Sequence, residues 1–186
     1  MGVQDQLAAL LLLVAAVRNP TVRLCYLAAR DLLSEYSLSD VYPHLLNLLG
    51  CVNLTPDQAE HHLDELTQTF DIASRVARTR FGFSSDITPV ARPVAIDGTR
   101  EQIRQGNHRE VVFWLVATYA RCHKILATDA PELERGRSSA FEDLMADLDI
   151  QSPADLARRA EAAIAFMPTL WDATEAILAT NPHPST

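Results

Sequence analysis

Apolar residues recur at helical spacing along most of the chain, and no segment shows the alternation of apolar and polar residues that is typical of a half-exposed strand. Start and stop signals bound these apolar stripes. The clearest is Thr55-Pro56-Asp57-Gln58, a capping box that predicts a helix from there to about Arg78. Helices are predicted over residues 7–17, 20–36, 39–49, 56–78, 98–105, 108–127, 138–148 and 153–180. The fold class is therefore predicted to be all-α, as an antiparallel helical bundle.

Single residues predict several of the helix boundaries. Gly50 should end the helix before it, because glycine readily adopts the left-handed conformation. A break is expected at Gly106-Asn107, with Asn107 as the cap of the long helix that follows and Asp97 as the cap of the short helix before it. Pro168 should kink the last helix, because proline has no N–H to donate to the preceding turn.

One long segment, residues 81–96, breaks the helical pattern. It contains Gly82, Pro89 and Pro93, and short strand-like pieces are expected over residues 89–96. Irregular segments of this length inside compact domains often have a function, so this loop is a candidate part of a binding site.

Length and composition favour a single helical domain with a real core. The chain has 186 residues, of which 48% are hydrophobic, and we expect N-terminal helices over 1–69 and a bundle over 70–182. The net charge is −8 and no stripe of Lys and Arg is present, so nucleic-acid binding is not expected. A local basic pocket for a small anion is compatible with these charges.

The cysteines and the apolar N-terminal run indicate the compartment. Cys25, Cys51 and Cys122 are odd in number and far apart, which is typical of buried, reduced thiols in a cytoplasmic protein. Residues 7–17 are continuously apolar but reach only half the length of a membrane span, so we interpret them as a buried helix and expect no membrane association.

The densest group of polar side chains lies around the predicted break at Gly106. Arginine guanidinium groups beside an indole ring can bind a planar, anionic ligand such as a nucleotide. The alternative is a solvated helix start that needs no ligand. The candidate ligand-binding residues are Arg100, Arg104, His108, Arg109, Glu110 and Trp114.

Other patterns lack partners at the spacing that their chemistry needs. His61 and Glu65 could share a metal ion, but a structural zinc site needs four ligands. The Asp147-Leu148-Asp149 triplet has the form of a nucleotidyltransferase metal motif but lies in a predicted helix, and Arg137 separates Gly136 from Ser138. We therefore predict no catalytic residue, no metal site and no cofactor.

Residues 70–182 resemble a known family. The segments that carry the resemblance are FDIASRV, SSDITPVARPVAIDGTREQI, GNHREVVFWLVATYARCHKIL, FEDLMADLDIQSPADLARRAEAA and the closing LW-x-x-x-E-x-I. They are similar to the C-terminal helical domain of nucleotidyltransferases related to the aminoglycoside (kanamycin) enzymes. Arg100, Glu101, His108, Arg109, Glu110 and Trp114 match the motif of that domain. The resemblance implies a helical domain that helps to bind the acceptor substrate and contributes to a dimer, but the catalytic domain is missing from this chain.

These observations lead to one functional expectation and two alternatives. We expect a non-catalytic, nucleotidyltransferase-like helical domain that binds a small polar or anionic ligand or a partner chain and forms homo-oligomers. The first alternative is a protein-interaction or dimerisation module. The second is an enzyme, either a degenerate transferase or a ribonuclease of the HEPN class, which uses an Arg and a His close together on a helix. Arg104 and His108 have only three residues between them and straddle the predicted break at Gly106, and Arg121 and His123 are too close, so neither pair has the four-to-six-residue spacing of that class.

Overall fold

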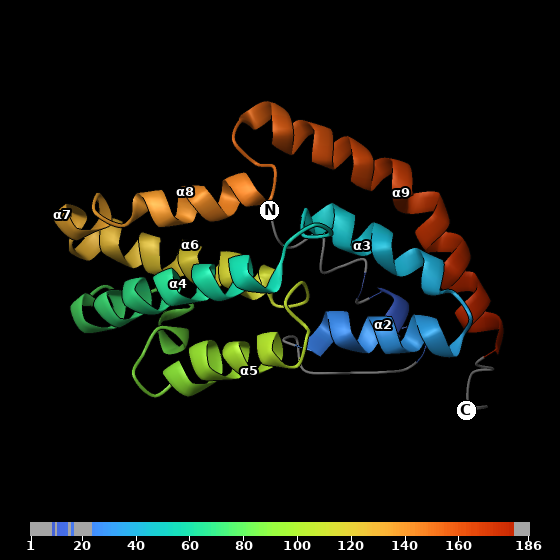
Figure 1. Cartoon of the computed structure of the whole chain (residues 1–186), viewed down its shortest axis with the longest axis horizontal. Helices are drawn as coiled ribbons and strands as arrows, with labels where there is room; N and C mark the ends of the chain where they lie inside the picture. Colours follow the sequence, from blue (N-terminus) through green and yellow to red (C-terminus); the bar gives the residue numbers. More distant parts are fainter. Residues whose placement is uncertain (1–8, 10, 15, 17–23, 181–186) are drawn as a thin grey trace. The chain divides into compact units, whose positions relative to one another are not determined.

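The computed structural model describes residues 9, 11–14, 16 and 24–180, and every regular element within these ranges is a helix (Figure 1). The predicted all-α class is therefore confirmed. Residues 7, 8, 10, 15 and 17 of the helix predicted over 7–17 lie outside the described residues, but residues 9 and 11–14 are helical. The antiparallel arrangement stays a prediction.

Two compact units divide the chain. One combines Met1–Val52 with Ser152–Thr186, and the other is the continuous segment Asn53–Gln151. The predicted boundary between residues 69 and 70 falls inside a helix of the second unit.

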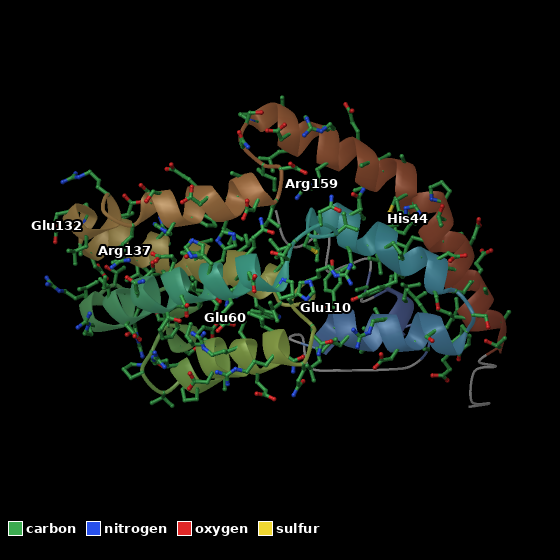
Figure 2. All side chains as sticks on the ribbon, in the orientation of Figure 1. His44, Glu60, Glu110, Glu132, Arg137 and Arg159 are labelled. Carbon is green, nitrogen blue, oxygen red and sulfur yellow. The ribbon has the colours of Figure 1, made fainter. Side chains whose placement is uncertain are left out.

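The described elements of the first unit are α2 (Cys25–Glu35), η2 (Ser39–Val41), α3 (Tyr42–Leu49) and α9 (Pro153–Thr180). The unit packs its long C-terminal helix against α3 and η2, and α2 packs on the same two elements. The helix α9 contacts α3 and η2, with Phe166, Leu170 and Ile177 on its buried face. The His44 ring of α3 stacks on Phe166 at 5.6 Å between centroids (Figure 2). Arg159 of α9 donates to the Leu49 carbonyl at 3.1 Å, which satisfies an acceptor at the end of α3.

The second unit contains the remaining helices. They are α4 (Pro56–Val76), η3 (Ser84–Asp86), η4 (Pro93–Asp97), α5 (Gly98–Arg104), α6 (Val112–Asp129), α7 (Pro131–Glu134) and α8 (Ser138–Asp147). The pair α4 and α6 forms the centre of this unit, and α5 and α8 each pack on α4. Leu63, Leu66 and Phe70 of α4 and Leu115 and Tyr119 of α6 are at most 1% exposed. Burial of these side chains is the main stabilising term for the unit.

Two helix ends agree with the sequence signals. Thr55 Oγ1 accepts from the Gln58 N–H at 3.2 Å, and Gln58 Oε1 accepts from the Thr55 N–H at 3.0 Å, so the predicted capping box is present. Gly50 ends α3 in the left-handed conformation, with φ of 77°.

Of the other local expectations, the break at Gly106 is confirmed, and those for Asp97, Asn107 and residues 89–96 were wrong. Asp97 has helical backbone angles and no capping hydrogen bond, because η4 runs directly into α5. Asn107 is not a cap either: turns occupy residues 108–111 and α6 begins only at Val112. The chain breaks at Gly106, with φ of 85°, as expected. The strand-like pieces predicted over 89–96 are replaced by turns and by the π-helix η4.

The three cysteines are buried and free, as predicted. Burial raises the pKa of the Cys25 thiol to about 11 and that of Cys122 to about 12, so both are protonated thiols at neutral pH. The Cys51 thiol donates to the Leu46 carbonyl at 3.4 Å.

No helix in the described part of the chain is both long enough and apolar enough to cross a membrane.

Candidate ligand-binding site

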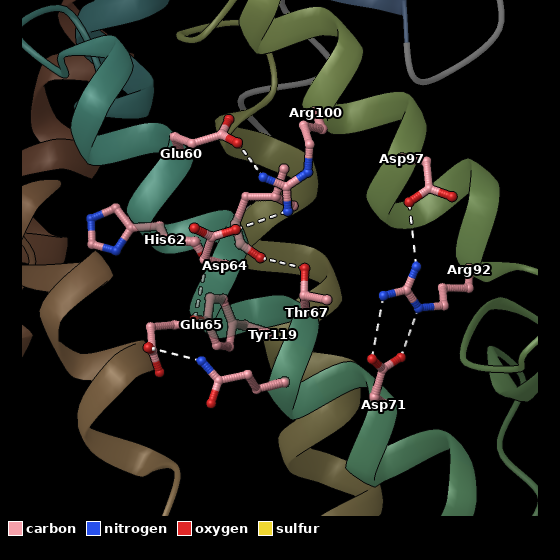
Figure 3. Close-up of polar contacts among 12 residues, drawn as sticks. Glu60, His62, Asp64, Glu65, Thr67, Asp71, Arg92, Asp97, Arg100 and Tyr119 are labelled. Carbon is pink, nitrogen blue, oxygen red and sulfur yellow. Dashed lines mark hydrogen bonds and ion pairs between the residues drawn. The ribbon is translucent and has the colours of Figure 1, made fainter.

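Arg100, one of the predicted ligand-binding residues, points at α4 (Figure 3). Its guanidinium donates to Glu60 and, at 2.9 Å, to Asp64 Oδ1. Glu60 and Asp64 are one helical turn apart, so both carboxylates face α5. Two acidic groups therefore neutralise this arginine, and its role in the structure is to fasten α5 to α4.

Arg92 makes a second connection of the same kind (Figure 3). Its guanidinium donates to both carboxylate oxygens of Asp71 on α4, at 2.8 and 3.3 Å, and to Asp97 at 3.3 Å. A bidentate pair fixes both distance and orientation. Arg92 thereby holds the end of the predicted loop, residues 81–96, against α4.

The turn after Gly106 presents the remaining predicted residues in different environments. Glu110 is buried, at 5% exposed, and the Arg109 side chain is half-buried. His108 Nδ1 lies 3.2 Å from the Gly106 carbonyl. Arg104 is exposed and forms no ion pair with any residue that the structure describes.

Trp114 belongs to a cluster that joins α6 to the segment before η3. The Arg121 guanidinium carbon lies 5.8 Å from the Trp114 ring centroid and 6.0 Å from that of Phe83. Arg121 also pairs with Asp86 at 2.9 Å. Phe81 and Phe83 stack in parallel at 5.2 Å, and Lys124 Nζ lies 5.9 Å from the Phe81 ring. We call these five residues, Phe81, Phe83, Trp114, Arg121 and Lys124, the aromatic–cation cluster.

The cations of this cluster differ in how they are neutralised. Arg121 has the Asp86 carboxylate, whereas Lys124 is exposed and has no carboxylate partner in the described part of the chain. Arg78 and Arg80 precede Phe81, and their exposed side chains also form no ion pair among the described residues. Positive charge beside stacked rings is thus available to an anion at this place, although the whole chain is acidic.

Asp129 at the end of α6 holds the segment that leads into the cluster. Its carboxylate accepts from the N–H groups of Arg78 and Thr79, at 2.7 and 2.9 Å, and from the Thr79 hydroxyl at 2.6 Å. These hydrogen bonds, led by the one from the Arg78 N–H, lower the pKa of Asp129.

This lowered pKa makes a prediction about acid stability. The unfolded pKa is about 3.9, so the contribution of Asp129 is complete above that pH and is lost as the pH falls through the lower folded value. We expect Asp129→Asn to be less stable than the wild type at pH 7, with a smaller difference at pH 3. Urea unfolding at both pH values measures this. Glu132→Gln, which removes an exposed carboxylate three residues later, is the control; a difference for Asp129→Asn that is independent of pH would contradict the account.

Two histidine–carboxylate pairs were not predicted. His62 Nε2 lies 2.8 Å from Asp147 Oδ2, which also accepts from Gln58 Nε2 at 3.1 Å. His123 Nδ1 lies 3.3 Å from Glu134 and its ring stacks against Phe141. The side chains of His62 and His123 are only 3% and 12% exposed. They connect helices, and neither imidazole is presented to a substrate in solution.

Metal binding has no support in the described residues, where no group of three or more His, Cys, Asp or Glu side chains could hold an ion. Of the predicted ligand-binding residues, Trp114 lies beside the Arg121 guanidinium, whereas Arg100 is paired with carboxylates of α4. Sequence reasoning missed Phe81, Phe83 and the pairing of Arg121. The available signals were the F-x-F spacing and the seven-residue interval between Trp114 and Arg121, which places both on one face of α6.

No family model, curated protein or solved structure gives a significant match to this chain.

Proposed function

We propose that this chain is a non-catalytic binding protein whose second unit binds a small, planar, anionic ligand at the aromatic–cation cluster. The observation that carries the proposal is the ammonium group of Lys124. It is exposed, lies over the Phe81 ring of the Phe81–Phe83 stack, and has no carboxylate partner among the described residues. Aromatic faces bind planar rings, and cations beside them bind negative charge. A mononucleotide combines both features.

The neighbouring charges support the same ligand class. Arg78 and Arg80 are exposed beside Phe81, and the hydrogen bonds of Asp129 fix the backbone at Arg78 and Thr79. A pre-ordered backbone lowers the entropic cost of binding. The resemblance of residues 70–182 to helical domains of nucleotidyltransferases points to substrate binding as well, without the Gly-Ser and D-x-D motifs that the transfer reaction requires.

A thermal-shift comparison tests this proposal. ATP and ADP are expected to raise the melting temperature, because a ligand that binds only the folded state stabilises it, by about 2.7 kcal/mol at a hundred times its Kd. Tripolyphosphate, which has no ring, should give a smaller shift. Kanamycin, a cationic aminoglycoside, should give none.

Matched variants locate the site. Lys124→Gln and Arg80→Gln should each weaken nucleotide binding by about tenfold, since each removes one charge that faces the anion. Arg104→Gln is the control, because Arg104 is also exposed but ends α5, outside the cluster. Shifts that Arg104→Gln removes and Lys124→Gln leaves intact would refute this location, and a flat response to all nucleotides would refute the proposal.

A further inference from the structure

A stripe of large apolar side chains runs along the exposed side of α9. Ile164, Met167, Trp171 and Leu178 are 72%, 50%, 55% and 40% exposed. Their intervals of three, four and seven residues place them on one face, as in the heptads of paired helices. Surface leucines scattered singly need no explanation, but a continuous stripe marks an interaction surface.

This stripe is separate from the face that α9 uses inside its own unit. The buried residues are Phe166, Leu170, Ala173, Thr174 and Ile177. At 100° per residue, the two sets lie roughly a quarter turn apart around the helix axis. The helix therefore has two apolar faces: one is packed inside its unit, and the other is exposed.

The charges beside the stripe restrict what can bind it. From Glu161 to Thr180 the helix carries Glu161, Asp172 and Glu175 and no Lys or Arg. Both arginines of α9 lie near its start and are engaged: Arg158 pairs with Asp155 at 2.8 Å, and Arg159 donates to the Leu49 carbonyl. One border of the stripe is therefore acidic, whereas the other adjoins the buried face of α9, and a surface that complements the acidic border must be basic.

Pro168 lies within the stripe. Proline has no N–H, so the helical hydrogen bond to the Ile164 carbonyl is not formed. The Trp171 indole already donates to Glu175 at 2.7 Å, which orients its ring along the helix.

We propose that the Ile164–Leu178 stripe of α9 docks an amphipathic helix of a partner protein, with Lys or Arg on the borders of its apolar face. A second copy of α9 fits less well. In an antiparallel pair centred on Pro168, Glu161 of one copy would lie opposite Glu175 of the other, and like charges at such positions are unfavourable. An anionic lipid surface would be repelled by the same carboxylates.

The test uses two synthetic helical peptides of about three heptads, with leucine at the a and d positions and either Lys or Glu on the flanks. Fluorescence anisotropy of labelled peptide measures binding to the full chain. The Lys peptide should bind at least about tenfold more tightly than the Glu peptide. The double variant Glu161→Lys/Glu175→Lys should reverse this preference.

Substitutions in the stripe locate the contact. Ile164→Ser and Trp171→Ser should abolish binding of the Lys peptide without unfolding the protein, because both side chains are exposed. Val90→Ser, at a valine of the other unit that is 88% exposed, should have no effect. Equal affinity for both peptides, or no binding of either, overturns the proposal. So does a homodimer in sedimentation that Ile164→Ser dissociates, or binding to phosphatidylserine vesicles.

Discussion

Tyr119→Ala is expected to lower the free energy of unfolding of the second unit by about 3–5 kcal/mol. The Tyr119 ring is 0% exposed and stacks against Phe141 at 5.3 Å and His123 at 6.0 Å, so truncation leaves a large cavity. Its hydroxyl donates to the His62 carbonyl at 3.2 Å, and burial raises the pKa of this phenol, which keeps it a donor at neutral pH.

Tyr119→Phe separates packing from hydrogen bonding. It keeps the ring and removes one donor, so it should cost only about 1 kcal/mol. Urea unfolding should be followed by the fluorescence of Trp114 in a Trp171→Phe background, because Trp171 would report on the other unit. Equal losses for both substitutions would show that the ring does not pack as described.

His62→Ala is expected to cost about 2–4 kcal/mol. The side chain is 3% exposed, and its loss removes both a buried ring and the partner of Asp147 that connects α4 to α8. The adjacent His61 is exposed, so His61→Ala is a matched control that should change stability by less than about 0.5 kcal/mol. A large loss of stability for His61→Ala, or none for His62→Ala, would contradict the placement of His62 on the buried face of α4 and His61 on its exposed face.

Local signals predicted local structure well. The Thr55–Gln58 box and the Gly50 stop depend on contacts within a few residues, and both are present. The signals failed at Asp97 and Asn107, although both side chains suit a cap. Each side chain instead binds a residue five positions earlier: Arg92 donates to Asp97, and Gln102 accepts from Asn107.

The site was harder to predict because its pairings join distant segments. Arg100 has its partners 36 and 40 residues earlier on another helix, so its sequence neighbourhood cannot distinguish a ligand contact from an ion pair. Arg121 and Phe83 are likewise brought together only when the segment before η3 packs on α6. Pairings between distant segments need the tertiary structure, and they decide which cations remain available to a ligand.

Fluorescence of Trp114 tests the central claim most directly. A Trp171→Phe variant leaves Trp114 as the single tryptophan, next to Arg121 in the aromatic–cation cluster. Titration with ADP should give a saturable change in emission, which Lys124→Gln shifts to about tenfold higher ADP and Arg104→Gln leaves unchanged. If the emission of Trp114 does not respond to ADP, or if Lys124→Gln leaves the titration unchanged, the cluster is not the ligand-binding site.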